Sequence, residues 1–184
     1  MSRSDRQIRL NDVLDAYQAG LASEGDREAF ELLYRRWHPR GLRLAQRLTR
    51  NPDEARDVMQ DAALTIARDI RKLKDPARFS AWAFTIVRRR AADHIDRAVR
   101  RRNAEVSAEA PEGEQGSDEA LSLKQALAHL PDSERLILTL FYLDGLRGHE
   151  IAASLGIPLG TVKSRLFAAR KALKSVYTKG DDHA

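Results

Sequence analysis

The stretch between Leu130 and Leu173 constrains the fold more than any other part of this chain. Gly156-Ile157-Pro158 divides it, because glycine tolerates the left-handed conformation past a helix end and proline cannot continue a helix. After this break, apolar residues recur at spacings of four, three, four and three, at Val162, Leu166, Ala169, Leu173 and Val176. This spacing predicts a helix with one apolar stripe that begins near Leu159-Gly160-Thr161.

The predicted helix is basic away from its apolar stripe. No acidic residue interrupts Leu159–Ser175, and the cationic residues fall largely off the stripe, at Lys163, Arg165, Arg170, Lys171 and Lys174. Pro131 and Asp132 open an earlier helix, and Gly145 and Gly148 flank a loop before a short second helix. Two helices joined by a tight glycine-containing turn, the second one basic, form a helix-turn-helix. This pattern favours DNA binding over the alternative, an amphipathic helix whose basic face is merely solvated.

The amino-acid composition indicates which kind of partner the protein binds and which kinds of site it lacks. The 184 residues include 32 Lys and Arg against 27 Asp and Glu, and the net charge of +5 favours a polyanionic partner. The absence of cysteine excludes disulfides and thiolate-held metals, and the five histidines show no ligand spacing, so we predict no cofactor and no metal. No apolar run is long enough for a signal peptide or a transmembrane helix, so we predict no direct membrane insertion.

The sequence contains no complete enzymatic motif of the zinc-protease or nucleotide-binding kind. His149-Glu150 would suit a zinc protease only with a second histidine four residues after the first, and that position is Ala153. Neither of the glycine-rich phosphate-binding motifs, GxGxxG and GxxxxGK[ST], occurs in the chain. We therefore predict that the protein is not an enzyme.

Helical spacing also dominates the first half of the chain, and no segment alternates with period two. Asn51-Pro52-Asp53-Glu54 has the form of a helix start, with an N-cap, a proline at the first helical position and an acidic first turn. Asp75-Pro76 repeats this start signal. Upstream, a helix from Asp26 is predicted by apolar residues at Ala29, Phe30, Leu33, Trp37, Gly41, Leu44 and Leu48. The fold class predicted from these patterns is all-α.

A basic stretch and an acidic stretch follow one another in the middle of the chain. Residues 84–102 contain seven Arg and two Asp, whereas residues 103–120 contain six acidic residues and no basic one. The acidic stretch holds a single valine as its only large apolar residue, so it cannot bury enough surface to order itself and is predicted to be a flexible linker. We therefore expect two small helical domains joined by a flexible acidic linker. The predicted divisions are an N-terminal extension at 1–22, a domain at 23–102, the linker at 103–120, a domain at 121–178 and a tail at 179–184.

Specific residues now suggest a family. Leu130-Pro131, Glu150-Ile151-Ala152 and the run from Gly156 to Leu166 closely resemble region 4 of bacterial extracytoplasmic-function (ECF) sigma factors of the sigma-70 family. Asp57-Val58-Met59-Gln60-Asp61 resembles region 2.2 of the same family. The run from Phe79 to Arg88, with Asp93-His94, resembles regions 2.3 and 2.4. The resemblance implies a region 2 domain that binds core RNA polymerase and the −10 promoter element, followed by a region 4 domain that binds the −35 element.

The resemblance also assigns the polymerase-binding residues. Asp57, Gln60 and Asp61 lie at i, i+3 and i+4, so they share one helical face. In the family this face docks on the coiled coil of the polymerase β′ subunit, and the second domain meets the β flap. A solvated helix face is the alternative. Family members are commonly held inactive by an anti-sigma factor, so the resemblance implies core RNA polymerase, promoter DNA and an anti-sigma factor as partners of a cytoplasmic protein.

By the same resemblance, the −10 surface comprises Arg88, Arg89, Arg90, His94 and Arg97. Cationic side chains neutralise the phosphates of separated strands, and guanidinium groups stack on unpaired bases. His94 has an alternative interpretation as a simple helix-surface residue. The aromatic residues Trp82 and Phe84 fit the helix core better than they fit a stacking platform.

The −35 surface implied by the resemblance comprises Thr161, Lys163, Ser164, Arg165, Phe167 and Arg170. Lys163 suits a guanine and Phe167 a thymine methyl group, although a partly buried Phe167 is an equal alternative. Arg165 and Arg170 are assigned to phosphates. Arg147 replaces the serine that commonly caps the next helix in the family, so Glu150 is expected to lack its capping-box partner, at a cost of about 0.5–2 kcal/mol.

Two other functions remain open at this point. A helix-turn-helix regulator that acts without polymerase would not need the acidic face at Asp57–Asp61. A sigma-like adaptor that binds an anti-sigma factor instead of DNA would tend to lose the basic residues, which this chain keeps.

Overall fold

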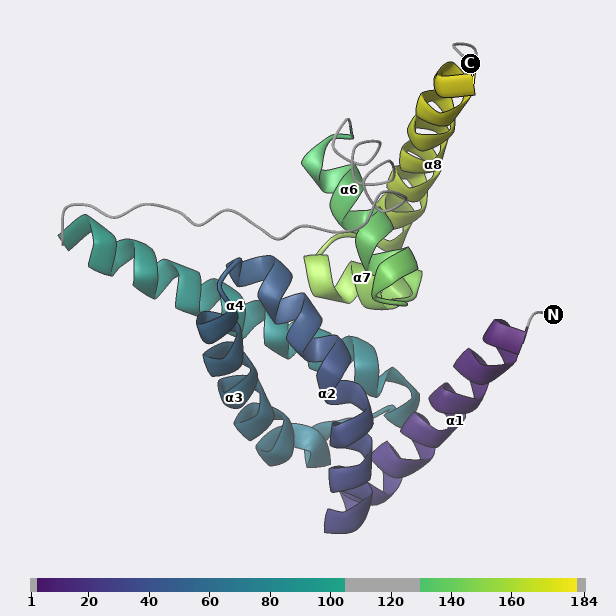
Figure 1. Cartoon of the computed structure of the whole chain (residues 1–184). Helices are drawn as coiled ribbons and strands as arrows, with labels where there is room; N and C mark the ends of the chain where they lie inside the picture. The colour runs from purple at the N-terminus through teal and green to yellow at the C-terminus, as the bar shows by residue number, and fades with distance from the viewer. Residues whose placement is uncertain (1–2, 105–129, 182–184) are drawn as a thin grey trace. The chain divides into compact units, whose positions relative to one another are not determined.

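The computed structural model describes residues 3–104 and 130–181, and all regular structure within them is helical (Figure 1). The predicted all-α class is therefore confirmed. The chain divides into two compact units, one spanning Met1–Arg101 and the other containing most of the chain from Arg102 onward. Residues 105–120 of the predicted linker lie outside the described residues. None of the helices in the described ranges is long and apolar enough to cross a lipid bilayer.

The first unit contains four α-helices and two short 3-10 turns. In chain order they are α1 (Arg3–Glu24), α2 (Arg27–Thr49), α3 (Pro52–Asp69), η1 (Ile70–Lys72), η2 (Pro76–Arg78) and α4 (Phe79–Ala104). The N-terminal helix α1 packs against α2 and both 3-10 turns. It runs past residue 22, where the sequence placed the end of an N-terminal extension.

Side-chain caps fix where these helices begin. Asp26 accepts a hydrogen bond from a backbone N–H of the first turn of α2 at 2.9 Å. Asn51 caps α3 by accepting from two backbone N–H groups, at 2.9 and 3.3 Å, with Pro52 at the first helical position. Both predicted starts are confirmed. Asp75 caps the short turn η2, and α4 follows from Phe79.

The core of the first unit is built around Trp37, which is fully buried. Its ring centroid lies 5.3 Å from that of Phe84 and 6.0 Å from that of Phe79, so α2 and α4 meet through aromatic contacts. Phe84 is also fully buried, which confirms its predicted place in the core. Gly41 leaves room for the indole, because a Cβ there would lie 2.7 Å from a ring carbon of Trp37.

The second unit contains the predicted helix-turn-helix. Its elements are α6 (Asp132–Leu138), the π-helical turn η3 (Thr139–Leu143), α7 (Gly148–Leu155) and α8 (Leu159–Asp181). Gly156 ends α7 in the left-handed conformation at φ 68°, which lets the chain turn sharply into α8. The predicted apolar stripe of α8 is buried at Val162, Leu166 and Ala169.

The expectation for Glu150 is corrected by the structure. Its side chain is buried, and its carboxylate accepts a hydrogen bond from the backbone N–H of Arg147 at 2.7 Å. This is the glutamate's half of a capping box, and it needs only the backbone of the capping residue. Replacing serine by Arg147 therefore removes the hydroxyl half of the motif and leaves the carboxylate half in place.

Candidate functional site

The exposed face of α3 carries Asp57 and Gln60. Both side chains are exposed, and neither has a hydrogen bond or an ion pair with any other described residue. Leu64 continues this face one turn further on and is 67% exposed, although the sequence analysis did not single it out. An acid, an amide and a leucine on one helix edge form a surface that a basic, amphipathic helix can cover.

Asp61 differs from its neighbours because it turns toward α4. Its Oδ2 lies 3.2 Å from His94 Nε2 and 3.8 Å from Arg97 Nη2. The Asp61 side chain is 42% exposed, that of His94 is 17% exposed and that of Arg97 is 56% exposed. The structure thus joins a residue predicted for polymerase binding to two residues predicted for the −10 element.

The five basic residues predicted for the −10 surface do not share one face of α4. Arg90, His94 and Arg97 follow each other at intervals of four and three and face α3, where Arg90 Nη2 donates to Thr65 Oγ1 at 2.9 Å. Arg89 is exposed beside them. Arg88 projects from nearly the opposite side of α4, because a helix turns about 100° per residue.

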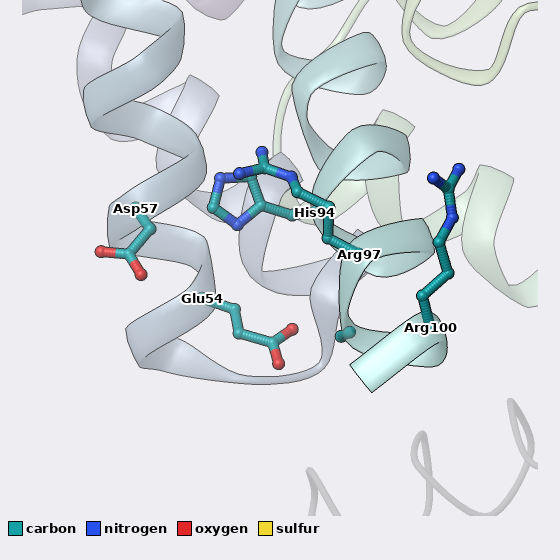
Figure 2. A pocket seen from close by; sticks show the side chains of 6 residues that line it. Glu54, Asp57, His94, Arg97 and Arg100 are labelled. Carbon is teal, nitrogen blue, oxygen red and sulfur yellow. The ribbon is translucent and has the colours of Figure 1, made fainter. Parts of the chain in front are cut away.

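A groove of about 510 Å³ lies between α3 and α4 (Figure 2). Glu54 and Asp57 line it from α3, and His94, Arg97 and Arg100 line it from α4. The groove therefore has one acidic wall and one basic wall, and Asp61 bridges the two helices beside it.

A second groove in the same unit has a volume of about 370 Å³. Its lining includes two large apolar residues of α4, Trp82 and Ile86, and two basic ones, Arg89 and Arg90. The structure leaves the Trp82 ring half-buried, 6.1 Å from that of Phe79, so it belongs partly to the core and partly to the groove. The remaining lining residues are Thr65, Asp69, Lys72 and Asp93.

Two basic neighbours lower the pKa of Asp69, which lines this groove. Arg68 Nη2 donates to one of its carboxylate oxygens at 2.9 Å, and Lys72 Nζ to the other at 2.7 Å. These hydrogen bonds favour the charged form, so Arg68 and then Lys72 hold the pKa of Asp69 well below its usual range. The carboxylate is therefore ionised at any pH near neutrality and offsets the charge of both basic residues.

The exposed face of α8 carries Lys163, Ser164 and Phe167. Phe167 is 72% exposed, so the alternative prediction of a partly buried ring is wrong. The Ser164 hydroxyl donates to the backbone carbonyl of Thr161 at 3.0 Å, which leaves its oxygen free to accept. Lys171 is exposed on the same face, one turn after Phe167, and was not among the predicted site residues.

Arg165 and Arg170 flank this face on opposite sides. Arg165 is half-buried. The guanidinium carbon of Arg170 lies 5.3 Å from the ring centroid of Phe141 and 5.5 Å from that of Tyr142, so Arg170 makes cation–π contacts with η3.

Models of two families match the chain. Sigma-70 region 2 matches residues 33–101, and sigma-70 region 4 matches residues 120–173. The two matches lie in the two units, and each includes the helices that carry the candidate residues.

Relatives that match over most of their length are RNA polymerase sigma factors. The RNA polymerase sigma-H factor of Pseudomonas aeruginosa is 31% identical over 167 residues, covering 81% of this chain and 86% of the relative. The ECF RNA polymerase sigma-E factor of Escherichia coli K12 is 32% identical over 167 residues, covering 82% and 87%. The ECF sigma factor SigM of Mycobacterium tuberculosis is 32% identical over 151 residues, covering 81% and 77%.

The fold has solved counterparts. The sigma factor RpoE of Bartonella quintana, in complex with the anti-sigma factor NepR, matches with a TM-score of 0.58 at 25% identity over 81% of this chain and 96% of that one. CnrH, in complex with the cytosolic domain of CnrY, shares the fold with a TM-score of 0.59 at 24% identity, over 93% of this chain and 99% of that one. The chain therefore belongs to the ECF group of the sigma-70 family of RNA polymerase sigma factors.

Proposed function

We propose that this protein binds core RNA polymerase and directs it to promoters by contacting both the −10 and the −35 elements. It acts as a specificity subunit and catalyses no reaction itself. The observation that carries the proposal is the face of α3 at Asp57 and Gln60, which is exposed and makes no side-chain pair within the described residues. A regulator that acts without polymerase has no need of such a face beside a cationic DNA surface.

The α3 face suits a basic docking helix such as the β′ coiled coil. Asp57 supplies a charge that is not already neutralised, and Gln60 supplies both a donor and an acceptor. Leu64 adds an exposed apolar contact at the end of the same edge. Polar groups around one apolar contact are the usual composition of a protein interface.

The groove around Trp82 suits an unpaired base of the −10 element. A base can stack on the half-buried indole, and such stacking contributes about 1–3 kcal/mol per base. Arg89 and Arg90 line the same groove, where they can meet the phosphates of the same strand. The groove thus supports strand capture on α4, with Trp82 as a stacking platform in addition to the predicted basic residues.

The exposed face of α8 suits the major groove at the −35 element. Lys163, Ser164 and Phe167 are the residues we propose to read base edges, and Thr161, Arg165 and Arg170 the residues to meet the backbone. Lys171 extends this set with one further phosphate contact. An anti-sigma factor is the remaining proposed partner, since RpoE of Bartonella quintana is bound to one in its structure. A protein that acts on polymerase and promoter DNA works in the cytoplasm.

The test is a titration of fluorescently labelled protein with core RNA polymerase. Asp57→Asn and Gln60→Ala are expected to weaken core binding by about tenfold each, as for groups at the centre of an interface. The matched control is Glu31→Gln, which removes an exposed carboxylate from α2 and breaks only a surface ion pair with Arg27. Absence of core binding by the unmodified protein would refute the proposal and favour the adaptor or a polymerase-independent regulator.

A further inference from the structure

We propose that Asp61 is a positioning residue that links polymerase binding to DNA binding. In the free protein its carboxylate holds His94 and Arg97, and a polymerase cation that docks on Asp61 releases them toward the −10 strand. This inference rests on the proposed function, because it assigns a coupling role to a residue shared by two proposed surfaces.

Asp61 differs from the other two predicted polymerase-binding residues on its edge of α3. Asp57 and Gln60 make no side-chain pair within the described residues, whereas Asp61 contacts two basic groups of α4 at 3.2 and 3.8 Å. The predicted polymerase-binding face therefore contains one carboxylate without an ion pair in the described structure, Asp57, and one that already pairs with α4, Asp61. Docking on Asp61 must compete with its contacts to α4.

His94 and Arg97 are both positioned close to the carboxylate of Asp61. Arg97 Nε donates to the backbone carbonyl of Asp93 at 3.1 Å, which holds the base of the guanidinium and leaves Nη2 directed at Asp61. The imidazole of His94 is mostly buried against the same carboxylate. A DNA phosphate that approaches Arg97 from this side must therefore compete electrostatically with the carboxylate of Asp61, whose Oδ2 lies 3.8 Å from Nη2.

Three other charged residues line this groove. Glu54 and Asp57 line the acidic wall, and Arg100 lines the basic one, but none of them is within 4 Å of an opposite charge across the groove in the described structure. The pairs of Asp61 are thus the direct ionic bridge between α3 and α4 at this groove. Removing Asp57 changes net charge equally without breaking that bridge.

Competition for the Asp61 carboxylate couples polymerase binding to DNA binding, and the coupling is positive. Polymerase and DNA each bind better when the other has already displaced Asp61 from His94 and Arg97, and the two effects are equal by thermodynamic linkage. Partly exposed ion pairs are worth little individually, so the coupling is expected to be about two- to fivefold in affinity. With a coupling of this size, the free protein has a lower affinity for DNA than the protein bound to polymerase.

The experiment measures binding of the free protein to a fluorescein-labelled DNA single strand of random sequence, at several salt concentrations. Asp61→Asn is expected to bind the strand about two- to fivefold more tightly than Asp57→Asn. Each variant loses one negative charge, but only Asp61→Asn removes the carboxylate that pairs with Arg97. One additional phosphate contact should steepen the salt dependence of log K by about 0.7. Arg97→Gln in the Asp61→Asn background is expected to abolish the gain, and Asp61→Glu should restore binding like that of the unmodified protein.

The strand-binding measurement and the titration with core RNA polymerase together separate the inference from the function on which it rests. If the unmodified protein does not bind core polymerase, the proposed function fails. If it binds core but Asp61→Asn and Asp57→Asn bind the strand equally, or Asp61→Asn binds it more weakly, only the coupling is refuted. Tryptophan fluorescence of each variant checks that the first unit is folded, since both tryptophans, Trp37 and Trp82, lie in it.

Discussion

Gly41 is a position where the structure gives both the sign and the size of a substitution effect. A Cβ at this site of α2 would lie 2.7 and 2.9 Å from two ring carbons of Trp37 and 3.0 Å from the Cε of Met59. Carbon atoms normally approach to about 3.5–4.0 Å. Trp37 and Met59 are buried, so neither can move aside without disturbing the core. Overpacking of this kind costs about 1–3 kcal/mol.

Helix propensity opposes this cost, because alanine is better than glycine inside a helix by about 0.5–1 kcal/mol. Gly41→Ala is therefore expected to destabilise the first unit by about 0.5–2 kcal/mol. Urea denaturation followed by tryptophan fluorescence measures this change, since both tryptophans report on the first unit.

Gly20 provides the matched control for this prediction. It lies inside α1, and a Cβ there would approach no closer than 3.9 Å to the ring of Pro76. Gly20→Ala should therefore stabilise the first unit by about 0.5–1 kcal/mol, through helix propensity alone. Equal stabilisation by both substitutions would show that the Trp37 ring does not pack against Gly41, and would refute the packing of the core described above.

Three further predictions follow from caps, charges and contacts. Asn51→Ala removes two hydrogen bonds at the start of α3 and should destabilise the first unit by about 0.5–2 kcal/mol in the same urea assay. Lys163→Ala should lower discrimination at one −35 position by about 1–3 kcal/mol, whereas Lys171→Ala should weaken binding to every promoter variant alike; equal losses for both would contradict the assignment. The carboxyl carbon of Asp69 should keep the NMR shift of an ionised group to below pH 3, because Arg68 lowers its pKa; titration near pH 4 would contradict this.

The sequence predicted local features well because their causes lie within a few residues. The caps at Asp26 and Asn51 depend on one side chain and the next backbone N–H groups. The buried stripe of α8 follows from helical spacing, as Val162 and Leu166 show. Glycine at 156 marked a turn for the same local reason.

The N-terminal helix shows where such reasoning fails. The sequence predicted only an N-terminal extension at residues 1–22, but this part of the chain forms α1, a helix of 22 residues. Val13 and Tyr17 are exposed on α1, whereas Asp15 is buried and pairs with Arg36 of α2 at 2.6 Å. A helix that exposes its large apolar residues and buries a carboxylate gives no amphipathic signal, because the pairing partner lies elsewhere in the chain.

The arrangement of the candidate site depended on contacts between helices. Asp61 and His94 are 33 residues apart, and no local pattern places them together. Arg88 and Arg90 are alike in sequence but project from different sides of α4, since a helix turns about 100° per residue. Trp82 fitted the spacing of a core residue, and only the packing of α4 shows that its ring also lines a groove.

Transcription from a randomised promoter library shows directly whether this protein works as a sigma factor. Core RNA polymerase is incubated with the library, with and without this protein, and transcript starts are sequenced. We predict protein-dependent starts that share two conserved boxes at the −10 and −35 positions, and loss of these starts with Asp57→Asn and Gln60→Ala at limiting protein. Transcript starts that do not change when the protein is added would contradict its function as a sigma factor.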